Sequence, residues 1–325
     1  MASSPRRPRA LFTHFSQGLL MGSADIIPGV SGGTMALIVG IYKNLIDAIG
    51  EAVTAVLLLV RGRGREAWTA VLALEWSLLL PLAAGIFLAI GLGSLFIPEL
   101  LDRYPVECRA LFFGLVAASL VIPWQERHTH RTWHYAVAAG AAALAFLLVG
   151  LPRSPDLADP SALRIGLTAA VAINAMILPG VSGAFLLEVL GLYRTTLEAL
   201  RDLDVGYVAV FALGAGLGLG AVAKLLSWLL DRHHDLTMAV LVGLLAGSLR
   251  ALWPWVGTVE HVGSDGAIEA IPDPSVLLTP GPEWPVALAL ALGGFAFVTA
   301  LAWLGRRRIA TGDEVLAEEH DDVRV

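Results

Sequence analysis

The chain has 325 residues, of which 56% are hydrophobic and 15% are charged, and its formal net charge is −6. Long apolar stretches at this composition are typical of polytopic helical membrane proteins and argue against a soluble domain. The only cysteine, Cys108, excludes an intrachain disulfide and a cluster of thiolate metal ligands.

The predicted elements begin with two short helical arms. Each arm is about 24 Å long at 1.5 Å per residue, which is less than the roughly 30 Å hydrocarbon core, so the pair suits a re-entrant hairpin. A basic loop and three spans follow, and a second hairpin with three more spans completes the pattern. In chain order these are arms 12–27 and 34–49, loop 61–65, spans 77–97, 108–123 and 132–151, arms 163–178 and 184–200, and spans 207–230, 236–255 and 286–305.

The two hairpins carry an internal repeat. Residues 25–34 read DIIPGVSGGT, and a close copy, MILPGVSGA, occupies residues 176–184, 151 positions later. The same offset aligns GIYK at 40–43 with GLYR at 191–194, whereas LLDR at 100–103 aligns with 229–232 at an offset of 129. The second half is therefore about 22 residues shorter, and we attribute the difference to the linker 61–76, which only the first half carries. We expect one transmembrane domain over residues 1–305, with repeats at about 12–151 and 163–305, and a disordered acidic tail at 306–325.

Loop charges predict the topology. Thirteen arginines fall in segments that are cytoplasmic if the N-terminus is cytoplasmic, against three in the outer loops, as the positive-inside rule requires. Both termini are therefore predicted on the cytoplasmic side of the cell membrane. Three spans, an odd number, separate the hairpins, so one enters from each side. The predicted fold class is an all-α polytopic membrane protein made of two inverted repeats, each a re-entrant hairpin plus three transmembrane helices.

The repeated motif is suited to binding an anion. Pro-Gly ends the incoming helix, and the small residues that follow start a new helix whose first amides have no intrahelical partner. Such amides and the positive end of the helix dipole attract phosphate. Paired broken helices in the two halves of a membrane protein indicate a transporter's binding site. The alternative is close helix packing by small residues. The predicted phosphate-binding residues are Gly29, Ser31, Gly32, Gly33, Thr34, Gly180, Ser182 and Gly183.

At residues 24–34, which read ADIIPGVSGGT, the sequence resembles the DUF368 family of bacterial and archaeal membrane proteins. The resemblance runs from about residue 17 to residue 304, and the second copy is looser, with Ala184-Phe185 where the first has Gly33-Thr34. It implies a transporter that returns undecaprenyl phosphate, the carrier lipid of cell-wall synthesis, from the outer to the inner leaflet. Only the charged head needs solvating, because the isoprenoid tail can stay in lipid.

Charged residues near the spans supply further candidates. Arg109 is the first choice for the cation that neutralises the phosphate, since it follows Pro105-Val106-Glu107 as in the family pattern, and Lys224 and Arg250 are secondary choices. The alternative is that these side chains extend to the membrane interface.

Acidic and neutral polar residues near the breaks complete the candidate set. Asp25 and Glu188 are candidates for proton coupling, with capping of backbone amides as the alternative role of Asp25. Tyr42, Tyr193 and Asn174 are secondary candidates, and the tyrosines could instead pack or join an aromatic belt. Lys43, Asp47 and Glu51 share one helix face and predict an intrahelical charge ladder.

Two other functions remain open. Membrane-embedded undecaprenyl diphosphate phosphatases carry a Pro-Gly-x-Ser-Arg-Ser loop, but Gly32 and Gly183 replace that arginine and no paired glutamates are evident. A small-anion channel or transporter would use the same amides. We predict no enzymatic activity, no cofactor and no nucleic-acid partner, and the oligomeric state is not assigned. The eight histidines show no metal-binding pattern, and five of them are predicted to be solvated at cytoplasmic loops or span ends: His128, His130, His134, His233 and His234.

Overall fold

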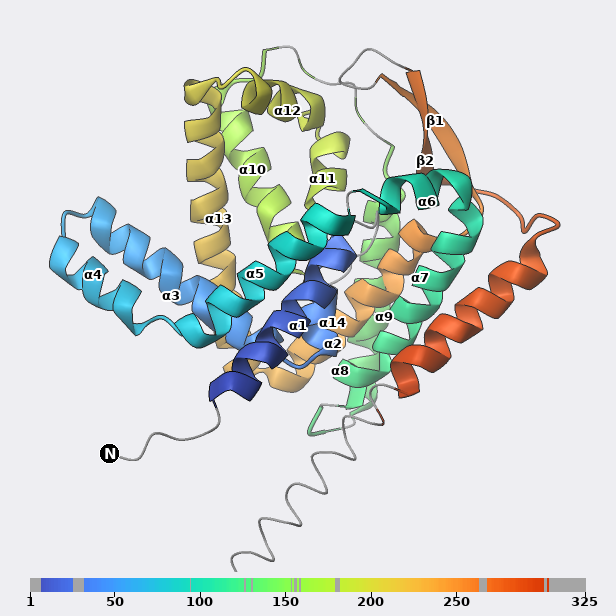
Figure 1. Cartoon of the computed structure of the whole chain (residues 1–325), viewed down its shortest axis with the longest axis horizontal. Helices are drawn as coiled ribbons and strands as arrows, with labels where there is room; N and C mark the ends of the chain where they lie inside the picture. Colours follow the sequence, from blue (N-terminus) through green and yellow to red (C-terminus); the bar gives the residue numbers. More distant parts are fainter. Residues whose placement is uncertain are drawn as a thin grey trace, which may run out of the picture.

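The computed structural model describes residues 7–25, 32–93, 95–125, 127–129, 131–152, 154, 157, 159–178, 182–262, 268–300 and 303. Helices account for most of this part of the chain (Figure 1). The first half contains α1 (Arg7–Asp25), α2 (Gly32–Ile38), α3 (Tyr42–Val60), α4 (Gly64–Ala73), α5 (Trp76–Gly93), α6 (Ile97–Arg103), α7 (Pro105–Ser119), α8 (Val121–Gln125) and α9 (Thr132–Val149). The second half contains α10 (Ala162–Ile177), α11 (Gly183–Val189), α12 (Tyr193–Arg201), α13 (Val205–Arg232), α14 (His234–Ser248), the 3₁₀ turn η1 (Leu249–Leu252), strands β1 (Val256–Val262) and β2 (Ile268–Leu277), and a C-terminal helix (Trp284–Ala300).

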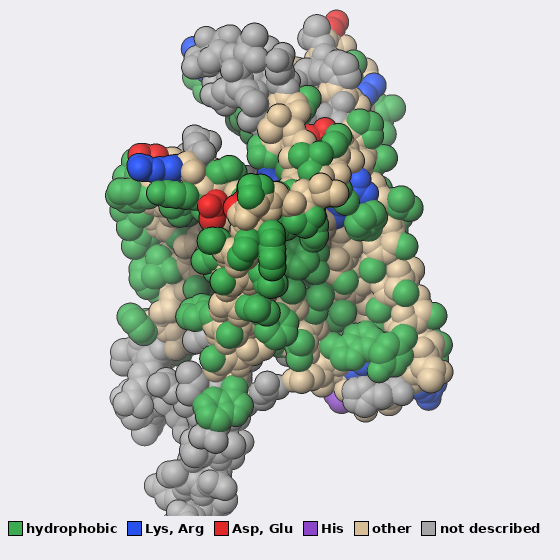
Figure 2. Space-filling view, turned by 90° about the vertical axis from the view of Figure 1, so that its right-hand side faces the viewer, with side chains coloured by type: hydrophobic (Ala, Val, Ile, Leu, Met, Phe, Trp, Pro, Cys, Tyr) green, Lys and Arg blue, Asp and Glu red, His purple; other side chains and the backbone are tan. Residues whose placement is uncertain are grey.

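The protein is a multi-pass membrane protein. Five helical stretches are long and apolar enough to cross a bilayer, and they cover residues 76–93, 105–125, 132–149, 205–232 and 234–252. α10 and the C-terminal helix are shorter apolar helices. On the face that carries the C-terminal helix, hydrophobic side chains predominate in a middle band, and the charged side chains lie nearer its two ends (Figure 2). Such a band matches the hydrocarbon layer between two polar interfaces.

Each predicted second arm is broken by a glycine. Gly40 and Gly191 have φ values of 73° and 69°, a left-handed conformation that glycine adopts without steric cost. After α2, the amides of Gly40 and Ile41 donate to the carbonyls of Leu37 and Ala36. This is the Schellman pattern that ends a helix, and the amides at 191 and 192 repeat it with the carbonyls at 188 and 187. The continuous arms predicted over 34–49 and 184–200 are therefore wrong, because α2 and α11 end one turn before α3 and α12 begin.

Two further elements differ from the prediction. α4 occupies most of the segment predicted to be a basic linker. Strands β1 and β2 form an antiparallel hairpin between the predicted spans 236–255 and 286–305, from the pair Val256↔Leu277 to Val262↔Ile268. Both strands contain several β-branched residues, which favour a pleated sheet. The described chain is mostly helical, which is consistent with the predicted all-α polytopic class, and the hairpin is an addition to it.

The packing of helix pairs follows the sequence repeat. A Cβ atom built at Gly85 of α5 would lie 2.2 Å from the carbonyl oxygen of Phe15 in α1. One built at Gly214 of α13 would lie 2.2 Å from the carbonyl oxygen of Gly166 in α10. Phe15 aligns with Gly166 at the offset 151, and Gly85 aligns with Gly214 at the offset 129. Each hairpin's first arm therefore packs in the same way against the first span of its own half.

A second matched pair joins the two halves to each other. A Cβ atom at Gly114 of α7 would lie 1.8 Å from the carbonyl oxygen of Ala291 in the C-terminal helix. One at Gly243 of α14 would lie 2.3 Å from the carbonyl oxygen of Ala138 in α9. Gly114 and Gly243 are again 129 positions apart. The second span of each half thus packs closely against the third span of the other half.

The two hairpins begin at different ends of the molecule. In Figure 1, α1 starts at the lower end of the molecule, whereas α10 starts at the upper end, near α12. One buried cluster lies between them and takes residues from eight helices, α1, α2, α3, α5, α7, α10, α13 and α14, and from η1. It includes Met21 and Ala24 of α1, Ala36 and Leu37 of α2, Tyr42 and Ile46 of α3, Ile177 of α10, and Leu241 and Leu245 of α14.

Candidate functional site

The first break lies between α1, which ends at Asp25, and α2, which begins at Gly32. The amide of Gly32 donates a 2.6 Å hydrogen bond to Oδ1 of Asp25. A carboxylate from the preceding helix therefore holds the first amide of α2, which is the capping role considered for Asp25. The predicted phosphate ligands Gly29 and Ser31 lie outside the described residues. Gly33 and Thr34 lie in the first turn of α2 and are buried.

The second break lies between Ile177 and Gly183, the first residue of α11. Ser182 is the N-cap of α11, and its Oγ accepts a 3.4 Å hydrogen bond from the amide of Phe185. Serine is favoured at this position because its oxygen can accept an otherwise unpaired amide hydrogen. A Cβ atom at Gly183 would lie 2.6 Å from the carbonyl oxygen of Ala172, so the start of α11 packs directly against α10. Gly180 lies outside the described residues.

The two breaks belong to one buried region. The hydroxyl of Tyr42, at the start of α3, donates a 3.1 Å hydrogen bond to the carbonyl of Ile177, at the end of α10. Tyr42 is 3% exposed, so it is an interior residue and not part of an interfacial belt. Leu178, which follows Ile177, packs against the same cluster. The structure therefore brings the first hairpin into contact with the end of the helix that leads into the second break.

Asn174 lies one turn before the end of α10. Its Nδ2 donates a 2.7 Å hydrogen bond to the carbonyl of Ala170. Its Oδ1 is buried and accepts no hydrogen bond from the residues that the structure describes. This oxygen can accept a hydrogen bond from a donor at the break, such as a protonated phosphate oxygen.

Arg250 is engaged away from the breaks. Its guanidinium donates to the carbonyls of Pro274 (2.9 Å), Ser275 (3.0 Å) and Phe146 (3.4 Å) and lies 4.5 Å from the centroid of the Phe146 ring. These contacts attach β2 to the end of α9. The structure therefore gives Arg250 a role in holding the β hairpin, and it does not bring this side chain to the hairpin breaks.

Lys224 lines a cavity between α3, α4 and α13 of about 660 Å³, together with Asp47, Glu51, Ser227 and Asp231. Nζ of Lys43 lies 2.7 Å from Asp47 and 3.1 Å from Asp231, and the hydroxyl of Ser227 donates to Asp47. The Lys43–Asp47 pair of the predicted charge ladder is therefore present, and both side chains also contact α13. Sequence spacing could not identify Ser227 and Asp231, which lie 180 or more positions after Asp47.

The remaining candidates lie at three places. Arg109 is near the N-terminal end of α7, and Val116, two turns further along this helix, joins the buried cluster. Glu188 lies in the last turn of α11, where its carbonyl accepts the amide of Ser154. Tyr193 is the first residue of α12 and is partly buried.

Known proteins resemble this chain over most of its length. A family described as VCA0040-like, undecaprenyl phosphate translocase-like, matches residues 21–268. A polyprenyl-phosphate transporter of Vibrio cholerae is 32% identical over 304 residues, which cover 88% of this chain and 94% of the relative. A polyprenyl-phosphate transporter of Staphylococcus aureus is 29% identical over 262 residues, which cover 74% of this chain and 86% of the relative. No solved structure matches the chain.

Proposed function

The chain belongs to the undecaprenyl phosphate translocase-like family, and from this premise we propose that it is a transporter of polyprenyl phosphate. In this proposal it acts as a flippase that returns undecaprenyl phosphate, or a related lipid, from the outer to the inner leaflet of the cell membrane. The observation that carries the proposal is the hydrogen bond from Tyr42 to Ile177, because it joins the two halves at their interrupted helices. Irregular backbone at membrane depth persists only where protein buries it or where it lines a polar path.

An inverted repeat would give such a site access to both leaflets in turn. The matched turns at Gly40 and Gly191 support two copies of one fold. The reciprocal packing of Gly114 and Gly243 supports a twofold relation between the halves. The hairpins also begin at opposite ends in Figure 1. Rocking of one half against the other around a fixed site is the usual consequence of this architecture. Cytoplasmic N- and C-termini, as the arginine distribution predicts, are part of the proposal.

The proposed path solvates only the phosphate. An isolated anion in hydrocarbon is very costly, so the head must exchange water for amides, hydroxyls and a compensating cation. We assign these roles to the amides of the two breaks, to Ser31 and Thr34, and to Arg109. Asn174 Oδ1 suits a protonated phosphate oxygen.

Asp25 gives this path a titratable element. Its carboxylate holds the Gly32 amide, one of the groups proposed for the phosphate. Two anions cannot share that amide without repulsion, so the phosphate has to displace Asp25 or meet it in the protonated form. Proton coupling through Asp25 follows from this competition.

The direct test is leaflet exchange of labelled undecaprenyl phosphate in vesicles that contain the purified chain. We expect exchange with the wild type and a loss of at least about tenfold in Arg109→Ala, since the buried phosphate would lose its charge partner. Arg194→Ala is the matched control, because Arg194 is exposed and pairs with Glu198 on its own helix. Absence of exchange in the wild type would contradict the proposed substrate. Equal exchange in both variants would remove Arg109 from the path.

The phosphatase alternative predicts release of inorganic phosphate from undecaprenyl diphosphate. The phosphatases carry an arginine in their Pro-Gly loop, and this chain has glycine at both corresponding positions, Gly32 and Gly183. These positions therefore supply no cation to stabilise a transition state. We therefore expect no phosphate release from purified protein. A small-anion transporter would carry inorganic phosphate across the vesicle membrane. A lipid transporter would exchange only a phosphate that carries a prenyl tail, and inorganic phosphate would not be transported.

A further inference from the structure

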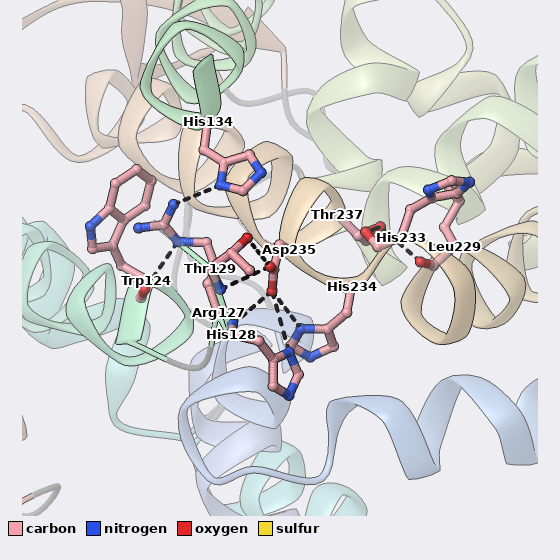
Figure 3. Close-up of polar contacts among 10 residues, drawn as sticks. All are labelled: Trp124, Arg127, His128, Thr129, His134, Leu229, His233, His234, Asp235 and Thr237. Atoms are coloured by element: carbon pink, nitrogen blue, oxygen red, sulfur yellow. Dashed lines mark hydrogen bonds and ion pairs between the residues drawn. The ribbon is translucent and has the colours of Figure 1, made fainter. Parts of the chain in front are cut away.

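A separate group of polar side chains lies where the linker between α8 and α9 meets the start of α14 (Figure 3). His128 comes from the linker in the first half, and His234 and Asp235 come from the first turn of α14 in the second half. More than 100 positions separate the two segments. None of these residues belongs to the hairpin breaks.

The three side chains place metal-binding atoms close together. Nδ1 of His128 lies 3.3 Å from Oδ1 of Asp235, and Nδ1 of His234 lies 3.6 Å from the same oxygen. One ligand atom from each residue lies within 4.8 Å of the other two. A tetrahedral zinc ion with bonds of 2.0–2.2 Å separates neighbouring ligand atoms by roughly 3.4 Å. Two of the three separations already fit, and a small rotation of the exposed His128 side chain would shorten the third.

Hydrogen bonds hold the carboxylate in position. Oδ1 of Asp235 accepts the amide of His128 (2.7 Å), and Oδ2 accepts the amide and hydroxyl of Thr129 (2.9 and 2.5 Å). Ligand carboxylates in metal sites are commonly oriented by such outer contacts. The Asp235 side chain is therefore already ordered, so binding an ion costs it little further conformational entropy.

The imidazoles are available as ligands. Nδ1 of His234 is buried and forms no hydrogen bond with the residues that the structure describes. His128 is 76% exposed, which gives an ion access from solvent and leaves room for a water ligand. Arg127 is the adjacent cation, but its guanidinium stacks 3.4 Å from the centroid of the Trp124 ring and contacts His134 (Figure 3). It therefore extends away from the three ligands.

We propose that His128, His234 and Asp235 form a binding site for Zn²⁺. Two imidazoles and one carboxylate are found as the three protein ligands of zinc sites in which water occupies the fourth position. Neutral imidazole also discriminates against Mg²⁺ and Ca²⁺, which prefer oxygen ligands. The bound ion would connect the α8–α9 linker to α14 and so join the two halves at this end of the molecule.

The test is calorimetric titration of untagged, metal-free full-length protein in detergent with Zn²⁺. We expect one site in the wild type and at least about tenfold weaker binding in His128→Ala and His234→Ala, in line with the loss of one of three ligands. His233→Ala is the matched control, because the His233 ring packs 5.4 Å from the Trp228 ring and lies outside the cluster. It should bind Zn²⁺ as the wild type does, and Mg²⁺ should not compete.

Hydrogen exchange provides a second readout that does not depend on transport. Zn²⁺ should slow exchange of the amides at 128 and 129 in the wild type and in His233→Ala, but not in His128→Ala. His128 is exposed, so its replacement should leave the fold intact, and unchanged thermal unfolding without metal would verify this. The same affinity in all four proteins, or no uptake of Zn²⁺ by the wild type in excess metal, would overturn the site.

Discussion

The two breaks share a sequence motif but differ in what holds the first amides of the new helix. At the first break, Asp25 reaches from the preceding helix to the Gly32 amide. At the second, Ser182 caps α11 with its own hydroxyl, and the position aligned with Asp25 is Met176. A carboxylate competes with an incoming anion, whereas a neutral hydroxyl can remain as part of its shell. The two halves therefore repeat the same motif, but a charged side chain caps the new helix at the first break and a neutral one caps it at the second.

The aligned glycines at the breaks should respond differently to one added methyl group, and this is the largest effect that we expect. In Gly183→Ala the new Cβ meets the backbone carbonyl of Ala172 at 2.6 Å, and a backbone atom in a helix cannot move cheaply. The expected cost is about 1–3 kcal/mol of stability. In Gly32→Ala the nearest atom is the end of the Asp25 side chain, also at 2.6 Å, and that side chain can rotate away.

Thermal unfolding of the two alanine variants in detergent measures this contrast. Gly183→Ala should unfold at a clearly lower temperature than Gly32→Ala. Gly32→Ala should instead alter transport, because it displaces the Asp25 carboxylate from the amide. If the two variants lose equal stability, the two breaks are held in the same way and the comparison fails.

Asp25→Asn separates capping from titration. Asparagine retains an oxygen that can accept the Gly32 amide, but it cannot gain a proton. Protonation of Asp25 removes the repulsion toward the phosphate, so wild-type exchange should rise as the pH falls, by at most about tenfold per pH unit for one proton. The asparagine variant should lack this component of the pH dependence.

The control for Asp25→Asn is Ser182→Ala, which alters the cap of the other break without a charge. It should cost about 1 kcal/mol of stability and keep the wild-type pH profile. The phosphate of the substrate also titrates, near pH 6, but it contributes equally to all three proteins. Identical pH profiles for wild type and Asp25→Asn would exclude a coupling role for Asp25.

Sequence reasoning located five of the six predicted spans and the helices on either side of both Pro-Gly motifs, because hydrophobic length and Pro-Gly motifs are local signals. It missed the helix ends at Gly40 and Gly191, since an isolated glycine is tolerated in a helix and only its backbone conformation reveals the turn. It listed Arg250 as a secondary candidate for the phosphate, because hydropathy does not show that the carbonyls of Pro274 and Ser275 in β2 accept hydrogen bonds from its guanidinium. The cluster of His128 with Asp235 was equally invisible, since its members come together only through packing of α9 on α14.

The smallest expected effect concerns the charge pairs that follow each hairpin. Lys43 and Asp47 align with Arg194 and Glu198, and both pairs are separated by 2.7 Å at i and i+4. Only Lys43 also reaches Asp231 on α13. Exposed pairs contribute at most about 1 kcal/mol each, so Lys43→Met should reduce stability by that amount or less, and Arg194→Met by about 0.3–0.5 kcal/mol.

A double-mutant cycle between Lys43 and Asp231 isolates the contact that Lys43 makes beyond its own helix. Lys43→Met, Asp231→Asn and the double variant should show a coupling of a few tenths of a kcal/mol in denaturant unfolding at low salt. The coupling should shrink at high salt, because both side chains are about half exposed and their charges are screened. A coupling of zero would mean that the hydrogen bond from Ser227 to Asp47 and apolar packing hold α13 against α3 without a contribution from this ion pair.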